Sequence, residues 1–412
     1  MMNKRTIKSK LRCLRRMLLL CLCAVLFTGS ALAEDVVDIS GEGYDCIYYK
    51  ITLPDGRVIL TGCKGTVGNY MDSRARILCL NPDMSVSWEY IDPSEGHCGF
   101  TWTALLKDGT LGVVFENSPY QTPEEKKLMF FTLDGEPAGK EFTFTEPGGL
   151  VNKVCSSCVW QVDYPDKGGR IEEVLDWKGN VILRYEGEDS SPLSGMGEMF
   201  EEEDGLVFAG REKGNNGCAK ILKMDFQGNL LWETVLPLTA PEAERSSINS
   251  CVRMEDGNYV ALVSESGHMG QNGLFDYSGY YLVKFSPAGR VLWTNREAFG
   301  RYPEKWFGNL VWYNGRFVVE MDDVRLGSDR NLHAEFLWMN EEGNWLGTTK
   351  LNKTPEDFPR IAKEKKPYTL GVTTLIPTKE GLWALIDYEA EKSTHLKQMD
   401  TKDDYLVKVP EL

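Results

Sequence analysis

Residues 254–262 read Met254-Glu-Asp256-Gly257-Asn-Tyr-Val-Ala-Leu262, and this stretch indicates the kind of fold that the chain adopts. An Asp-Gly pair favours a two-residue hairpin turn, because both residues accept the positive φ angles that such a turn requires. The residues after the turn are aromatic, β-branched or aliphatic, which is typical of a strand. The stretch therefore predicts a β-hairpin.

The same pattern recurs along the chain, which indicates an internal repeat. Its copies are marked by the first-turn glycines Gly56, Gly109, Gly205, Gly257, Gly315 and Gly381. One gap in this series, near residue 157, is filled by Cys155-Ser-Ser-Cys158. The series gives seven units of roughly 50 residues, which is the length of a four-stranded propeller blade. The fold class is therefore predicted to be all-β, a seven-bladed β-propeller of four-stranded antiparallel blades.

The seventh unit begins at Leu370 and has only three apparent strands, at 372–377, 382–388 and 405–409. A fourth strand is available at the other end of the chain, in Val36-Val37-Asp38-Ile39. Pairing the two ends would close the ring and remove two exposed sheet edges. We therefore expect the N-terminal strand to complete the last blade.

A second signature follows most of the hairpins by about 25 residues: a glycine turn that leads into a tryptophan-bearing strand. Its clearest copies are Asp225-Phe-Gln-Gly228-Asn-Leu-Leu-Trp232 and Phe285-Ser-Pro-Ala-Gly289-Arg-Val-Leu-Trp293. They resemble the quinoprotein-like (PQQ-like) repeat, D-x-x-x-G-x-x-x-W, whose tryptophan docks one blade on the next. The first copy has one residue fewer between Asp and Gly, and the second matches only the later half.

The enzymes of that superfamily use eight blades, an adjacent Cys-Cys disulfide and a calcium-held quinone. This chain has seven units and no adjacent cysteine pair after its first 33 residues. The resemblance therefore implies a non-catalytic member of the superfamily, with no cofactor.

The first 33 residues have the order of a secretory leader. Seven basic and no acidic side chains precede an apolar run at 17–27, and Ala31-Leu32-Ala33 then provides a small-x-small cleavage site. We expect cleavage after Ala33, export, and one propeller domain over 34–412, with an uncleaved anchor as the alternative. Without the leader the chain has 39 basic and 61 acidic side chains, a net charge of −22. This charge argues against nucleic-acid and anionic-membrane partners.

Eight cysteines follow the leader, and Cys155 and Cys158 are the candidate disulfide. A thioredoxin-type CxxC begins a helix, whereas the residues after Cys158 read as a strand. A zinc site would require a second CxxC or a histidine pair, which the sequence lacks. We expect a structural pair, either a hairpin-spanning disulfide or two packed thiols, and no metal.

The first and third turns of each unit are short, so the longer segments gather on the opposite face of the ring, where loops usually carry function. These segments are 62–76, 116–127, 211–219, 264–278 and 322–334, with links at 92–100, 186–199, 236–247, 296–308 and 350–369. A helical turn is expected within 354–366. The candidate ligand-binding residues on this face are Tyr70, Tyr120, His268, Phe275, Asp276, Tyr277, Trp306, Asp322, Asp323 and His333.

Aromatic side chains on a loop face stack on sugars or anchor a protein partner, although they also pack between blades. No sequence motif for a nucleophile, a phosphate loop or a dinucleotide site is present. The predicted function is that of a secreted, monomeric binding or scaffold propeller that recognises a protein or glycan at the cell surface. The alternative is an extracytoplasmic glycoside hydrolase or lyase with carboxylates near the central channel.

Overall fold

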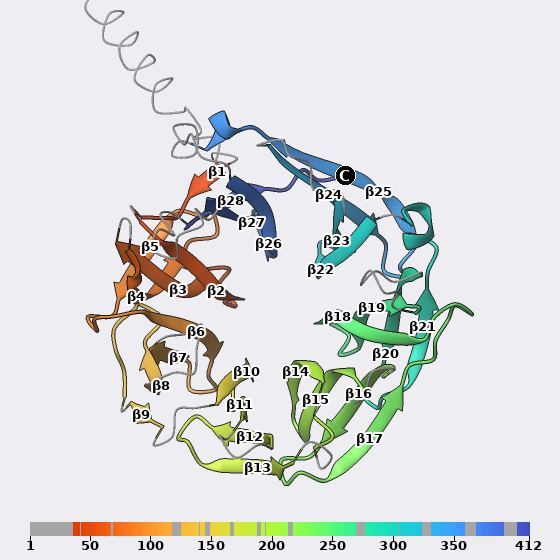
Figure 1. The fold of residues 1–412 in the computed structure, drawn as a ribbon, viewed down its shortest axis with the longest axis horizontal. Coiled ribbons are helices and arrows are strands. Elements are labelled where there is room, and N and C mark those ends of the chain that lie inside the picture. The colour runs from red at the N-terminus through yellow and green to blue at the C-terminus, as the bar shows by residue number, and fades with distance from the viewer. Residues whose placement is uncertain are drawn as a thin grey trace, which may run out of the picture.

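The computed structural model shows a closed ring of seven four-stranded antiparallel sheets, a β-propeller (Figure 1). It describes residues 36–41, 43–66, 69–117, 125–139, 141–144, 149–164, 169–187, 191–193, 195–212, 217–268, 277–303, 305–323, 331–358, 368–390 and 402–412. The predicted leader lies outside these ranges. Within them, no helix is both long and apolar enough to cross a lipid bilayer.

The blades follow the chain around the ring, and the strands of each blade run in order from the innermost to the outermost. Blade 1 holds β2 (Asp45–Thr52), β3 (Val58–Thr66), β4 (Asn69–Leu80) and β5 (Val86–Ile91). Blade 2 holds β6 (Cys98–Leu105), β7 (Leu111–Asn117), β8 (Lys126–Phe131) and β9 (Phe142–Thr143). Blade 3 holds β10 (Leu150–Val154), β11 (Cys158–Asp163), β12 (Ile171–Asp176) and β13 (Val181–Glu186). Blade 4 holds β14 (Met196–Glu202), β15 (Gly205–Arg211), β16 (Ala219–Met224) and β17 (Leu230–Val235).

Blade 5 holds β18 (Arg245–Arg253), β19 (Tyr259–Ser266), β20 (Ser278–Phe285) and β21 (Val291–Asn295). Blade 6 holds β22 (Lys305–Tyr313), β23 (Arg316–Asp323), β24 (Leu332–Met339) and β25 (Trp345–Lys353). Blade 7 holds β26 (Tyr368–Thr378), β27 (Gly381–Ala390), β28 (Lys402–Lys408) and, as its outermost strand, β1 (Val36–Asp38). Two short 3₁₀ turns, η1 (Phe299–Arg301) and η2 (Pro355–Asp357), lie in the links after blades 5 and 6.

The predicted closure by the N-terminal strand is confirmed. β1 pairs antiparallel with β28, with Val36 opposite Val407 and Asp38 opposite Tyr405. Figure 1 shows the two strands side by side where the start and the end of the ring meet. The last blade therefore combines both ends of the chain, and no blade is left one strand short.

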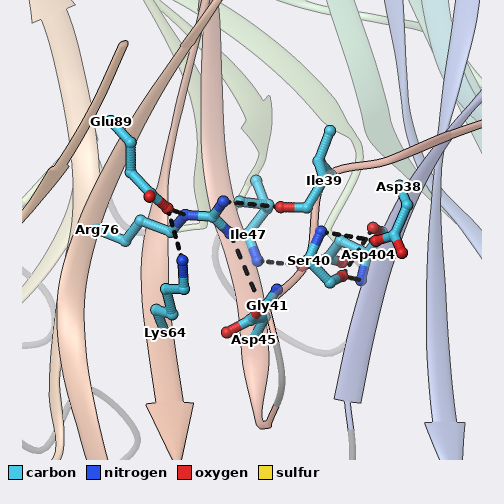
Figure 2. Close-up of polar contacts among 10 residues, drawn as sticks. All are labelled: Asp38, Ile39, Ser40, Gly41, Asp45, Ile47, Lys64, Arg76, Glu89 and Asp404. Atoms are coloured by element: carbon cyan, nitrogen blue, oxygen red, sulfur yellow. Dashed lines mark hydrogen bonds and ion pairs between the residues drawn. The ribbon is translucent and has the colours of Figure 1, made fainter. Parts of the chain in front are cut away.

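Polar contacts of the residues that follow β1 also stabilise the closed ring (Figure 2). Ser40 Oγ donates to the carbonyl oxygen of Asp404 at 2.9 Å, and the Asp404 carboxylate accepts the Ile47 N–H at 2.8 Å. Arg76 Nη2 donates to the Ile39 carbonyl oxygen at 2.7 Å, and Arg76 Nε lies 2.7 Å from Glu89 Oε1. These contacts join the N-terminal segment to blades 1 and 7, and we call them the closure network.

The predicted turns at Gly56, Gly109 and Gly257 are longer than the two-residue form, whereas Glu202 pairs with Gly205 across a two-residue turn. At 53–57, the Gly56 N–H donates to the Leu53 carbonyl oxygen and the Leu53 N–H donates to the Arg57 carbonyl oxygen. Gly56 alone has a positive φ there (93°), whereas the two-residue form with both φ angles positive occurs at Asn314-Gly315 (48° and 74°). The glycine is required in both forms, because a side chain at positive φ is strained.

The core lies between neighbouring blades rather than inside any one of them. One cluster, for example, combines Val207 and Ile221 of blade 4 with Tyr259 and Val283 of blade 5. The outermost strands add a docking contact at the third turns. An ideal Cβ on Gly289 of blade 5 would lie 2.4 Å from the Trp232 ring of blade 4. Trp88 against Gly135 and Trp293 against Gly343 repeat this contact, so the tryptophan of one blade covers the turn glycine of the next.

One expectation about secondary structure is wrong. The segment 62–76 was expected to be a long loop, but β3 extends to Thr66 and β4 begins at Asn69. Tyr70 consequently belongs to a strand. The helical turn expected within 354–366 is present as the 3₁₀ turn η2 (Pro355–Asp357), and residues 359–366 lie outside the described ranges.

Candidate functional site

Trp306 lies near the start of the innermost strand of blade 6, on the face where the longer loops and links lie, which we call the long-loop face. Its side chain is 63% exposed, the largest fraction among the large hydrophobic residues that the structure describes. The next residue, Phe307, is buried against Tyr280 and Phe299 of blade 5. Successive side chains of a strand point to opposite faces, so the buried Phe307 ring holds the strand in place while the Trp306 indole remains in solvent.

Tyr277 is held at the same face of blade 5 by an ionic network. Its hydroxyl accepts a hydrogen bond from Arg296 Nη2 at 2.6 Å, and Arg296 lies 3.4 Å from the buried carboxylate of Glu265. Glu265 also accepts the backbone N–H and the hydroxyl of Thr239. This network joins the links on both sides of blade 5 and keeps the phenol ring in a fixed position.

The other predicted residues fall into three groups. His268 is largely exposed, 3.6 Å from Glu244, and its neighbour Gly267 donates to the Tyr277 carbonyl oxygen, so His268 and Tyr277 flank the same loop. His333 is exposed on β24 and its Nδ1 lies 2.9 Å from Asn352 Oδ1. Tyr120, Phe275 and Asp276 lie outside the described residues.

Asp322 and Asp323 were expected in a loop, and this expectation is wrong. They form the end of β23, where Asp322 pairs with Trp306 and Asp323 with Lys305. The hairpin continues further than its polar sequence indicated. The longer hairpin brings the backbone of Asp322 next to that of Trp306.

Sequence reasoning missed two exposed apolar residues on the long-loop face of blade 3. Tyr164 (60% exposed) follows β11, and Leu150 begins β10. Arg170 lies over the Tyr164 ring at 5.8 Å from its centroid. The signal for Tyr164 was its position between a predicted strand and the Pro165-Asp-Lys-Gly segment, which is a turn pattern.

Cys155 and Cys158 lie at the first turn of blade 3, on the face opposite the long loops. Their sulfur atoms are 2.9 Å apart as two thiols, and the Cys155 N–H donates to the Cys158 carbonyl oxygen. The hydrogen bond between the two thiols lowers the pKa of Cys155 and raises that of Cys158. The residues after Cys158 form a strand, as predicted, and the disulfide itself stays a prediction.

A β-bulge interrupts the innermost strand at the same place in all seven blades. The bulged residues are Tyr48, Thr101, Asn152, Gly197, Asn249, Asn309 and Thr373. We call them the bulge ring, and the residues that follow them the post-bulge ring.

The innermost strand of each of the seven blades is a sheet edge that faces the ring axis. Side chains bind some of the backbone carbonyl groups on these edges. Trp102 Nε1 donates to the Val151 carbonyl oxygen of the next blade at 2.9 Å, and Asn309 Nδ2 donates to that of Thr373 at 3.2 Å.

Four members of the post-bulge ring form a compact group that we call the axial cluster: Tyr49, Trp102, Lys153 and Glu198. The two aromatic rings are 4.5 Å apart, and the Lys153 ammonium lies 5.8 Å from the Tyr49 ring and 5.4 Å from the Trp102 ring. Lys153 Nζ is 2.5 Å from Glu198 Oε2. Burial opposes the charge of Lys153, but the Glu198 carboxylate outweighs it, so the pKa of Lys153 is raised. A partly exposed carboxylate is therefore held beside an aromatic pair.

A second buried pair, Glu116 and Lys126, joins blades 2 and 3. Lys126 is fully buried and donates to Gln161 Oε1 at 3.0 Å. Burial raises the pKa of Glu116 to about 7 and lowers that of Lys126 to about 8. Both side chains are enclosed by protein, so this pair is structural. In the described part of the chain, no group of three or more His, Cys, Asp or Glu side chains is placed to hold a metal ion.

The similarity between this chain and known proteins is low. No family model and no curated protein matches the chain. Among solved structures, it is similar to the β-propeller domain of the Trilobed protease from Pyrococcus furiosus (10% identity, TM-score 0.46, covering 89% of this chain and 96% of that one). It is also similar to the polysaccharide lyase Uly1 (8%, 0.48, covering 90% and 91%) and to Sqt1 from Chaetomium thermophilum (10%, 0.42, covering 92% and 100%). This likeness assigns no activity to the chain.

Proposed function

We propose that this chain is an exported, non-enzymatic binding propeller that recognises a protein or glycan at the cell surface through its long-loop face. The observation that carries the proposal is the exposure of Trp306 on a rigid innermost strand. An exposed tryptophan costs little conformational entropy on binding, and it buries a large apolar area.

Other features of the face support this function. Tyr277 is fixed by Arg296, and Tyr164 is exposed on blade 3. A binding surface usually relies on a few such aromatic anchoring residues. The acidic surface favours neutral or basic partners.

The test compares Trp306→Ala with Leu231→Ala, a control on the outermost strand of blade 4 that is 46% exposed. One arm measures melting-temperature shifts with a panel of glycans, and the other measures cross-linked capture of protein partners from intact cells. Trp306→Ala should weaken the interaction by about 30-fold, the effect of losing a hot-spot residue, and Leu231→Ala should change it less than about twofold. Equal binding by the two variants would refute the proposal.

The axial cluster favours a second candidate, an extracytoplasmic glycoside hydrolase or lyase. Glu198 is a partly exposed carboxylate beside Tyr49 and Trp102, an arrangement that can act on a sugar stacked against aromatic rings. In this case Glu198→Gln should abolish turnover of a glycan that the wild type cleaves, whereas Trp306→Ala should reduce its binding only.

A further inference from the structure

The residue two positions after each bulge forms a third ring around the axis, with one exceptional member. Its members are Lys50, Thr103, Val154, Met199, Cys251, Val311 and Leu375. The last six are at most 9% exposed, which is expected where blades pack together. Lys50 alone carries a charge at this position, and it is partly exposed. The other six blades thus show that the fold does not need a charged residue at this position.

The stem of Lys50 lies in the seam between blades 1 and 7. Lys50 pairs with Leu60 across β2 and β3, so the two side chains share one face of the sheet. Leu60 packs in a cluster with Ile376 and Leu385 of blade 7. A lysine stem is longer than the side chains at the equivalent positions, and β2 is the innermost strand (Figure 1). We therefore place the ammonium group on the axial side of the seam, where protein encloses most of it.

No neighbouring carboxylate compensates this ammonium group within the described part of the chain. Burial is the one cause that lowers the pKa of Lys50, to about 7. On the strands beside β2, the Asp404 carboxylate of β28 accepts the Ile47 N–H. In the axial cluster, Glu198 is already paired with Lys153. A partly buried cation without a counter-charge destabilises the fold, and such groups are concentrated at functional sites.

We propose that Lys50 anchors a binding site for the carboxylate of a small ligand at the axis of the ring. A single ammonium group matches one negative charge, whereas phosphate is usually held by several cations or by a helix N-terminus. One hydroxyl group lies in the same seam, because Thr374 is the post-bulge residue of blade 7, the blade that Lys50 faces.

The net charge of residues 34–412 selects for a small ligand. A surface with a net charge of −22 after the leader repels extended polyanions. A small carboxylate can still bind, because its interaction with Lys50 is short-ranged and partly shielded from water. This site is separate from the surface around Trp306, so Trp306→Ala should leave carboxylate binding unchanged.

The experiment measures binding of acetate and of D-glucuronate to the purified protein by isothermal titration at two pH values. The variants are Lys50→Met and, as a control, Lys350→Met, whose lysine is exposed and paired with Glu335. Methionine fits the ring position, because Met199 occupies it in blade 4. The wild type and Lys350→Met should bind at about pH 6, and Lys50→Met should not. Because only the protonated amine attracts the anion, affinity should fall about 100-fold by about pH 9.

The two ligands distinguish the sources of the carboxylate. Tighter binding of D-glucuronate than of acetate assigns the site to an acidic sugar, and equal binding assigns it to a simple carboxylate. A nitrogen NMR titration provides an independent readout, because saturation with the bound ligand should raise the pKa of Lys50. The proposal is overturned if neither ligand binds at about pH 6, if Lys50→Met binds as the wild type does, or if the pKa of Lys50 does not change.

Discussion

Arg76 on the third strand of blade 1 donates to the carbonyl oxygen of Ile39, just after the strand that closes the ring, across 2.7 Å. Arg76 is 4% exposed, and its guanidinium also lies 3.9 Å from the fully buried carboxylate of Asp45. One side chain therefore binds the closing segment and compensates a buried charge inside blade 1. The stability of the closed ring should accordingly depend on this residue.

Replacing Arg76 by methionine should destabilise the ring strongly. The change removes the guanidinium beside buried Asp45, so that Lys64 is the cation that remains near it, and it removes the bond to Ile39. Breaking a buried ion pair costs about 3–5 kcal/mol in the free energy of unfolding. Arg184→Met is the matched control, because Arg184 is 47% exposed in its pair with Glu173 and should cost less than about 1 kcal/mol. Urea unfolding measures both values. Equal costs for the two variants would show that the closure network contributes no more than a surface ion pair.

Glu116 should make stability depend on pH between its ordinary pKa of 4.5 and its folded pKa of about 7. The Glu116 carboxyl keeps its proton to a higher pH in the folded protein than in the unfolded chain. The stability that this protonation contributes is therefore fully present below the unfolded pKa of 4.5, and it is lost as pH rises through the folded pKa of about 7. Glu116→Gln removes this titration. From about pH 5 to about pH 7.5, the wild type should therefore lose about 1–3 kcal/mol relative to the variant.

Urea unfolding at the two pH values measures this difference, with Glu297→Gln as a control at an exposed carboxylate. Parallel pH profiles for the wild type and Glu116→Gln would contradict the prediction.

Gly289→Ala should cost more than Gly257→Ala, although both glycines have a positive φ of 75–80°. A Cβ at residue 289 would meet the Trp232 ring at 2.4 Å, whereas a Cβ at residue 257 has nothing within 4 Å. Positive φ costs an alanine about 1 kcal/mol, and the clash adds about 1–3 kcal/mol at residue 289. Thermal melts of the two variants measure how much the contact between Trp232 and Gly289 adds to stability. Identical melting temperatures would show that this blade-to-blade contact adds nothing.

Mild oxidation should join Cys155 and Cys158, whose sulfur atoms are already 2.9 Å apart. Peptide mapping without reduction should show that the peptide holding both residues has lost two hydrogen atoms and resists alkylation, while Cys251, buried on another blade, keeps its thiol. The closed loop is very short, so the bond should add no more than about 2 kcal/mol to the free energy of unfolding. Full alkylation of both residues in the unfolded, oxidised protein would rule out the pair.

The ring was predictable because its signals are local and repeated. Each turn glycine, such as Gly257 or Gly289, adopts a backbone angle that other residues avoid, and the strands between them alternate in polarity. Closure was predictable because the final unit lacked a strand and residues 36–39 supplied one.

The candidate site was less predictable, because polar strands and loops have similar composition. β4 carries Ser73 and Arg74, and β23 ends in Asp322 and Asp323, so both hairpins looked like loops. Their backbones pair all the same, since ladder hydrogen bonds do not require apolar side chains. The position of Lys50 in its ring depends on the bulges, which shift the register by one residue and leave no mark in a single sequence.

The bond between Ser40 and Asp404 joins residues 364 positions apart. During synthesis the first strand therefore emerges long before its partner exists, and it remains without a sheet while the intervening blades fold in order. Ring closure is the slowest kind of contact for a chain to form, since it requires the longest loop to be closed. We infer that an incomplete chain is an open ring with two unpaired edges, so truncation near the C-terminus should produce aggregation rather than a smaller stable protein.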